Sequence, residues 1–86
     1  MWYVYFLKSK VRSNWVYVGS TNSVERRLRE HSDGLVISTK SFLPVYLDAY
    51  IAVCTETRAR ALEKYLKVGS GKAIAKKRIL SDEAKA

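Results

Sequence analysis

Apolar and aromatic residues are concentrated in three stretches of the chain. Residues 2–8 (WYVYFLK) and 15–19 (WVYVG) are rich in aromatic and β-branched residues, and turn-forming residues separate them. This pattern predicts a β-hairpin over residues 2–19. Residues 45–53 (VYLDAYIAV) alternate imperfectly between apolar and polar positions, which predicts a third, largely buried strand.

The hairpin has a simple expected register. If Tyr5 pairs with Tyr17, apolar side chains such as Val4 and Phe6 occupy one face of the sheet, and the tyrosines occupy the other. Side chains alternate between the two faces of a strand, so a shift of one residue would exchange the faces completely.

Three further segments have the periodicity of helices. We expect the first to be capped by Asn22 and to end near residue 32, before the sequence SDG. The second covers residues 56–68 and stops at Gly69, and the third, strongly basic, covers residues 71–80. Residues 36–44 (VISTKSFLP) are predicted to form a loop. The order of strands and helices indicates an α+β fold.

Length and charge narrow the function. The 86 residues suffice for one domain, which we expect over residues 1–80, followed by a frayed tail at 81–86. Sixteen Lys and Arg against eight Asp and Glu leave a net charge of +8, which favours phosphate-rich partners, although some basic proteins have no such partner. The first ten residues are too short an apolar stretch for a membrane span or a secretory signal, so we expect a cytosolic protein without a membrane partner.

Two short features have structural rather than catalytic interpretations. Cys54 is the only cysteine, which excludes an internal disulfide and a cysteine-based zinc site, and we expect it to be a buried thiol after an apolar run. The sequence GSGK at 69–72 lacks the earlier glycine of a phosphate-binding P-loop and follows a predicted helix instead of a strand. Gly69 and Gly71 are therefore predicted to end one helix and begin the next.

Two residues of the first helix lie where apolar side chains are expected. Val24 and Leu28 define its buried stripe, and Arg27 and His31 lie one turn apart along the edge of that stripe. Arg27 can extend its stem over apolar surface with its head group in water, and His31 can be a hydrogen-bonded residue near a helix C-terminus. Alternatively, both side chains serve a site on the sheet.

Glu63 is the corresponding anomaly in the second helix. It lies within the apolar stripe that Ala59, Leu62 and Leu66 form. A carboxylate on a buried face costs several kcal/mol unless a cation, a metal or hydrogen-bond donors compensate it. Glu63 can therefore form an internal ion pair with Arg27, or bind a metal opposite a phosphate-binding arginine.

Several of these features together resemble the GIY-YIG nuclease family. YVY at 3–5 and YVG at 17–19 stand where the family has GIY and YIG, and Tyr5 and Tyr17 are twelve positions apart. An arginine eight residues after Gly19, a histidine one turn later and a lone glutamate on the later helix extend the similarity to about Leu80. The resemblance implies a three-stranded antiparallel β-sheet flanked by helices.

The resemblance also implies an activity, the metal-dependent hydrolysis of DNA phosphodiester bonds in DNA processing or repair. By similarity, the catalytic residues are Tyr5, Tyr17, Arg27, His31 and Glu63. Tyr17 would hold or deprotonate the attacking water, His31 would relay the proton, and Arg27 would meet the scissile phosphate. Glu63 would bind Mg²⁺ or Mn²⁺, and a lone carboxylate suits Mg²⁺ because this ion keeps most of its waters. No small-molecule cofactor is implied.

The chain departs from the family pattern in three places. Tyr3 replaces the first glycine of GIY, Ser20 stands where repair enzymes of the family carry lysine, and Ala75 stands near an asparagine of several active members. Ser20 and Ala75 favour an alternative, a basic nucleic-acid-binding module that keeps the scaffold without turnover. The basic side chains that we expect to contact phosphates are Arg26, Lys40, Lys67, Lys72 and Lys76.

Overall fold

An antiparallel sheet with the strand order β2-β1-β3 forms the centre of the computed structural model, which describes residues 1–81. The elements follow one another as β1 (Trp2–Ser9), β2 (Val16–Thr21), α1 (Val24–Ser32), α2 (Ile37–Lys40), β3 (Val45–Val53), α3 (Glu56–Lys67), α4 (Gly69–Ile74) and the π-helix η1 (Ala75–Ile79). The predicted α+β fold with three antiparallel strands is confirmed.

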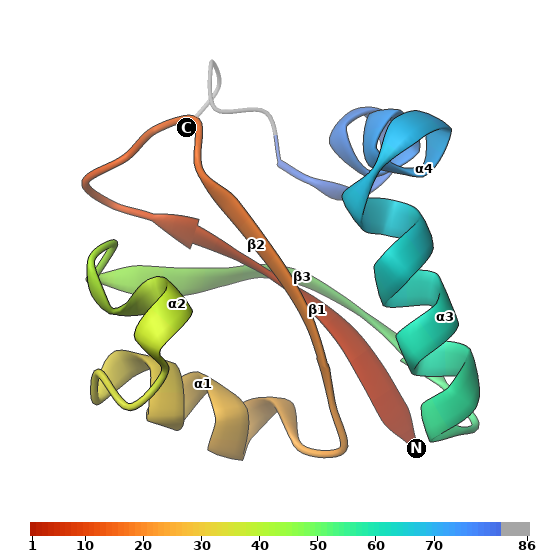
Figure 1. The fold of residues 1–86 in the computed structure, drawn as a ribbon, viewed down its shortest axis with the longest axis horizontal. Coiled ribbons are helices and arrows are strands. Elements are labelled where there is room, and N and C mark those ends of the chain that lie inside the picture. The colour runs from red at the N-terminus through yellow and green to blue at the C-terminus, as the bar shows by residue number, and fades with distance from the viewer. Residues whose placement is uncertain (82–86) are drawn as a thin grey trace.

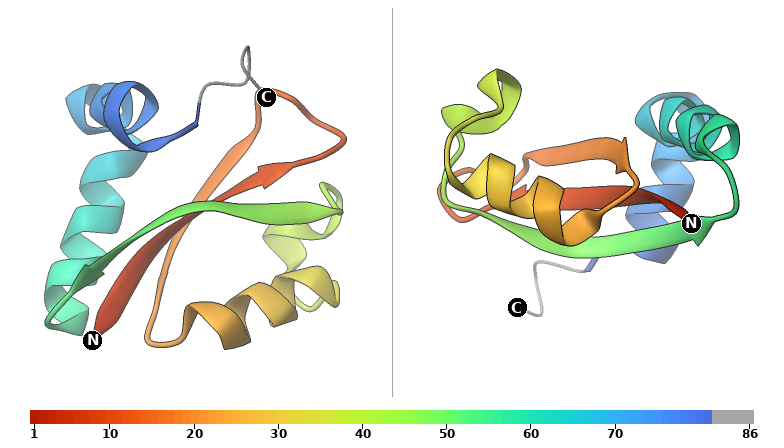
Figure 2. Two further views of the ribbon diagram at one scale, coloured as in Figure 1. Left: turned by 180° about the vertical axis from the view of Figure 1, so that it is seen from behind. Right: turned by 90° about the horizontal axis from the view of Figure 1, so that it is seen from below.

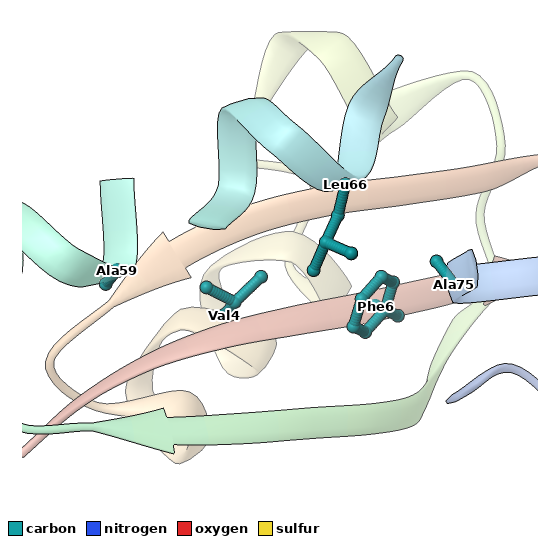
Figure 3. Packing of buried hydrophobic residues seen from close by; sticks show 5 residues of the cluster. All are labelled: Val4, Phe6, Ala59, Leu66 and Ala75. Atoms are coloured by element: carbon teal, nitrogen blue, oxygen red, sulfur yellow. The ribbon is translucent and has the colours of Figure 1, made fainter. Parts of the chain in front are cut away.

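Helices cover both faces of the sheet. Figure 1 shows α1 and α2 on one side and α3 and α4 on the other, and the views in Figure 2 agree. We call these sides the α1 face and the α3 face. On the α3 face, Val4 and Phe6 are fully buried against helical side chains (Figure 3), with Ala59, Leu66 and Ala75 completing the cluster. On the α1 face, Tyr5, Leu7 and Val45 form a second cluster.

The register of the hairpin differs from the expected one by two residues. Tyr5 pairs with Gly19, and Leu7 pairs with Tyr17. Because the difference is an even number, the predicted faces are unchanged, with Tyr5 and Tyr17 on the same side. Gly19 explains the register, since a Cβ atom there would lie 2.6 Å from the Tyr5 hydroxyl oxygen. The glycine of YVG therefore makes room for the ring of Tyr5.

A β-bulge explains the imperfect alternation of the third strand. Phe6 of β1 pairs with Ala49 of β3, whereas the next residue of β1, Leu7, pairs with Leu47. Asp48 is therefore the extra residue of β3 that has no partner in β1. A bulge of this kind reverses the faces to which the alternating positions point. Accordingly Leu47 packs in the cluster of the α1 face, and Ala49 packs in that of the α3 face.

Several predicted boundaries need correction. The N-cap of α1 is Ser23, whose hydroxyl accepts the Arg26 backbone N–H, whereas Asn22 accepts the Arg26 guanidinium. The segment 36–44, predicted to be a loop, contains the short helix α2. The last helical segment starts at Gly69 instead of residue 71, and its second half is π-helical.

The predicted break between the two helices α3 and α4 lies at Val68, and both Gly69 and Gly71 belong to α4. Gly69 has a left-handed φ of 56°, and the chain changes direction there after α3 ends at Lys67 (Figure 1). Gly71 is buried, and a Cβ atom there would lie 2.0 Å from the backbone oxygen of Tyr65. The two helices can approach this closely only where position 71 has no side chain.

Two predictions about the chain's periphery fail. Cys54 is exposed, not buried, because it follows Val53, the last residue of β3 that pairs with β1. Ser81 is not frayed, since it accepts a hydrogen bond from Lys8 and donates one to Asp48. The rest of the predicted tail, residues 82–86, lies outside the described residues. Within residues 1–81, no helix is long and apolar enough to cross a membrane.

Candidate active site

A buried hydrogen bond joins the first motif tyrosine to the only histidine. The Tyr5 hydroxyl lies 2.8 Å from Nε2 of His31, and the two side chains come from the middle of β1 and the last turn of α1. Tyr5 is 2% exposed and His31 is fully buried. The predicted lean of His31 towards the sheet thus brings it to both motif tyrosines, and its hydrogen bond is with Tyr5.

Thr39 contacts the second ring nitrogen of His31. Its hydroxyl lies 2.7 Å from Nδ1 of His31 and donates to the backbone oxygen of Val36 at 3.3 Å. When this hydroxyl donates to Val36, it accepts from the Nδ1–H group, and in that tautomer Nε2 accepts the Tyr5 hydroxyl. The sequence carries no pattern that marks Thr39, since its role depends on α2 folding back against α1.

Burial keeps this pair neutral. Burial lowers the pKa of His31 to about 4, and the nearby Arg27 cation acts in the same direction. Burial also raises the pKa of Tyr5 to about 12, although Arg27 opposes this shift. In the resting protein at neutral pH the shared proton therefore stays on Tyr5, and His31 is a neutral acceptor.

Tyr17 completes a cluster of three rings on the α1 face. Its ring centroid lies 6.2 Å from that of Tyr5 and 5.1 Å from that of His31, in a T-shaped arrangement with the histidine. Tyr17 is half-buried because β2 is an edge strand. It is thus more accessible to solvent than the other two members of the cluster.

Arg27 lies beside Tyr5 and forms an ion pair within its own helix. Its guanidinium donates to Glu30 at 3.0 Å, and both side chains are 35% exposed. This contact lowers the pKa of the Glu30 carboxyl. The alternative of an internal ion pair between Arg27 and Glu63 is wrong, since both find partners elsewhere.

Glu63 lies on the α3 face, across the sheet from the three rings. Its carboxylate accepts a hydrogen bond from Ser20 at 2.6 Å and pairs with Lys67 at 2.6 Å. Burial alone would raise the pKa of Glu63, but Lys67 and Ser20 together lower it, so the carboxylate is ionised. Ser20 follows Gly19 in β2, so Glu63 and the ring cluster adjoin the same edge strand from opposite faces.

The surroundings of Glu63 fit a divalent cation held by one carboxylate. Within residues 1–81, no group of three or more His, Cys, Asp or Glu side chains forms a metal-binding cluster. Mg²⁺ does not need such a cluster, because one or two carboxylates, water and substrate phosphate can complete its coordination. Glu63 is ionised and its side chain is 20% exposed, but a metal would have to displace the Lys67 ammonium, which lies 2.6 Å from the carboxylate.

The five basic residues expected to contact phosphates fall into two groups. Arg26 and Lys40 belong to α1 and α2, and Arg26 is held by hydrogen bonds to Asn22 and Thr21. Lys67, Lys72 and Lys76 line a groove of about 950 Å³ on the α3 face. The structure therefore does not bring the five together on one surface.

Comparisons with known proteins identify the family of the chain. Residues 1–78 match the family described as the GIY-YIG catalytic domain. Over 60 residues the chain is 37% identical to a UPF0213 protein of Bacillus licheniformis, which corresponds to 69% of this chain and 60% of that protein. The match thus spans less than two thirds of this relative's length. No solved structure matches the chain significantly.

Proposed function

Because the chain belongs to the GIY-YIG family, we propose that it is a metal-dependent nuclease that hydrolyses DNA phosphodiester bonds in DNA processing or repair. The observation that carries the proposal is the buried hydrogen bond between Tyr5 and His31, whose second ring nitrogen contacts Thr39. This arrangement provides a neutral imidazole that can accept a proton through a tyrosine, and it lies beside a partly exposed arginine.

The proposed proton path runs from water to His31 through Tyr5. Hydrolysis needs a deprotonated water and stabilisation of the charge that develops on the phosphate. Tyr17, at the accessible end of the ring cluster, positions the water. As the water transfers a proton to the Tyr5 oxygen, the Tyr5 proton moves to Nε2 of His31. The negative charge of a bound phosphate favours the resulting imidazolium.

Arg27 and Glu63 supply the remaining electrostatic functions. Arg27 lies beside Tyr5 with its guanidinium partly exposed, so it can approach a phosphate that binds over the ring cluster. Glu63 would hold Mg²⁺ or Mn²⁺ in place of its contact with the Lys67 ammonium. When bound, the metal supplies positive charge that stabilises the leaving 3′ oxygen.

A basic nucleic-acid-binding module without turnover is the second candidate. The observation that favours it is the ion pair that engages Glu63 with Lys67, next to Ser20 at a position where repair enzymes of the family carry lysine. A cleavage assay on branched, nicked, single-stranded and linear DNA distinguishes the two functions. Cleavage that requires Mg²⁺ or Mn²⁺ supports the nuclease, whereas binding without cleavage of any of these forms supports the module.

Replacing Thr39 with valine is expected to lower the cleavage rate by about ten- to a hundredfold, because His31 loses the partner that holds its tautomer. Thr39→Ser keeps the hydroxyl and should retain most of the activity. The ¹⁵N chemical shifts of the imidazole report the tautomer directly. Parent-like shifts and cleavage in Thr39→Val would contradict this positioning role.

The stability of the protein should depend on pH through His31. Its pKa is about 4 in the folded state and about 6.5 when unfolded. Above pH 6.5 both states are neutral and the stabilisation is complete. As the pH falls from 6.5 to 4, only the unfolded state gains a proton, so the free energy of unfolding decreases by about 3 kcal/mol.

Nuclear magnetic resonance provides the most direct check, because the chain has only one histidine. The imidazole resonances should not titrate in the folded protein between pH 7 and about 5. A titration midpoint near the ordinary value of 6.5 would show that His31 is not enclosed as described. The His31→Gln variant should also lose the dependence of unfolding free energy on pH above about 5.

A further inference from the structure

The groove on the α3 face combines an apolar floor with basic walls. It has a volume of about 950 Å³ and lies between the β1–β2 hairpin and the segment formed by α4 and η1. Its accessible apolar lining includes Trp15, Val16 and Val18, and the buried side chains of Phe6 and Leu66 lie beneath them. Among the described residues that line it there is no Asp or Glu, whereas five lysines do so, namely Lys8, Lys67, Lys72, Lys76 and Lys77.

Three of these lysines are available to an anionic ligand. Lys8 is hydrogen-bonded to Ser81, and Lys67 is paired with Glu63. Lys72, Lys76 and Lys77 are exposed, and none of them forms an ion pair within residues 1–81. They follow one another along α4 and η1, and all three residues line the same wall of the groove.

We propose that this groove binds an unpaired nucleic-acid strand, with its phosphates against Lys72, Lys76 and Lys77 and its bases against the apolar floor. Sites for single strands combine a positive groove for the backbone with surfaces on which bases pack. A duplex keeps its bases stacked inside and presents mainly charged backbone, so it would leave the apolar floor uncovered. The groove, about 950 Å³ in a molecule of 32 × 28 × 19 Å, is also small relative to the cross-section of a duplex.

The groove leads to the candidate active site. Tyr17 belongs to the edge strand β2 that lines the groove, and its ring packs in the cluster with Tyr5 and His31 on the opposite face of that strand. Lys67 lines the groove and is paired with Glu63. A strand in the groove would therefore reach the edge of β2, where both halves of the site meet. The link between the groove and the active site rests on the proposed nuclease function. It defines the substrate of that nuclease as DNA with an unpaired strand.

Binding without divalent metal tests the groove separately from catalysis. The probes are a fluorescein-labelled oligothymidylate of about ten nucleotides and a blunt duplex of equal length, and fluorescence anisotropy in EDTA gives both dissociation constants. The single strand should bind at least about tenfold more tightly than the duplex. Equal affinity, or tighter binding of the duplex, would overturn the proposal.

Two triple variants with the same loss of charge locate the contact. Lys72→Ala/Lys76→Ala/Lys77→Ala should weaken single-strand binding at least tenfold and reduce the slope of log K against log salt by about 2, since each phosphate contact contributes about 0.7. The control variant replaces three exposed basic residues outside the groove with alanine, namely Lys10, Arg58 and Lys64. It should lose far less affinity, and an equal loss in both variants would show that only net charge matters.

The results separate the groove from the proposed nuclease. Tight single-strand binding through these lysines, without cleavage of any DNA form with Mg²⁺ or Mn²⁺, would support the groove and refute the nuclease. Metal-dependent cleavage with no preference for the single strand in binding would refute the groove and leave the nuclease standing. Circular dichroism and thermal unfolding of all variants establish that the exchanged lysines leave the fold intact.

Discussion

Replacing Arg27 with alanine is expected to lower the rate of DNA cleavage by about a hundredfold or more, while DNA affinity changes little. Loss of one preorganised donor that stabilises charge in a transition state typically has an effect of this size. Arg27 lies beside Tyr5 and is only partly exposed, so neither water nor another side chain replaces its charge there. Single-turnover cleavage, measured beside binding in EDTA, checks both parts of the expectation.

Arg29 offers a matched control on the same helix. Its guanidinium pairs with Glu25 and is 66% exposed, so Arg29→Ala removes the same charge from the same helix but away from the ring cluster. This variant should cleave within a few-fold of the parent, because such exposed ion pairs contribute little. Equal loss of cleavage in both variants would assign the effect of Arg27 to general electrostatics.

Glu63→Gln should reduce the cleavage rate about as much as Arg27→Ala does, because it removes a different group of the proposed site. The substitution keeps the shape of the side chain and removes the carboxylate assigned to the metal. It also releases Lys67 from its ion pair, so DNA affinity should be unchanged or slightly higher. If Arg27→Ala and Glu63→Gln both cut as fast as the parent, the assigned site is wrong. A parallel preparation of the inactive variants excludes a contaminating nuclease.

Gly71→Ala is expected to destabilise the protein by about 3 kcal/mol or more, which for a domain of this size lowers the melting temperature by roughly 15 °C. The new Cβ atom would lie 2.0 Å from the backbone oxygen of Tyr65. Backbone cannot move aside as a flexible side chain can, so α4 would have to shift relative to α3. Thermal and urea unfolding monitored by circular dichroism measure the change.

Gly69→Ala is the matched comparison two residues earlier. Nothing lies within 4 Å of a Cβ atom at this position, so only the left-handed φ of 56° opposes the substitution. That conformation costs an alanine about 1–2 kcal/mol. Gly69→Ala should therefore be clearly more stable than Gly71→Ala. The reverse order would show that α3 and α4 are not packed as closely as described.

Local patterns in the sequence correctly predict most of the scaffold. Alternation and helical periodicity depend on neighbours within one or two turns, and for that reason the three strands and the two long helices are found where they are predicted. The same local rule places Val4 and Phe6 on one face and Tyr5 and Tyr17 on the other, even though the assumed register is wrong by two residues. The lean of His31 towards the sheet also follows from periodicity alone.

Pairings between distant residues are not predictable in this way. Tyr5 and His31 are 26 positions apart, and many partners satisfy the same periodicity. Glu63 finds Ser20 and Lys67 instead of Arg27, because the helix that carries it lies on the other face of the sheet.

The sequence by itself determined the elements of this protein, the faces of its sheet and the residue types that resemble a nuclease site. Only the tertiary structure decided which of those residues meet. The bulge at Asp48, the room that Gly19 leaves for Tyr5 and the role of Thr39 all arise from close packing. Packing depends on contacts between segments far apart in the chain, and such contacts leave no periodic pattern of residues in the sequence.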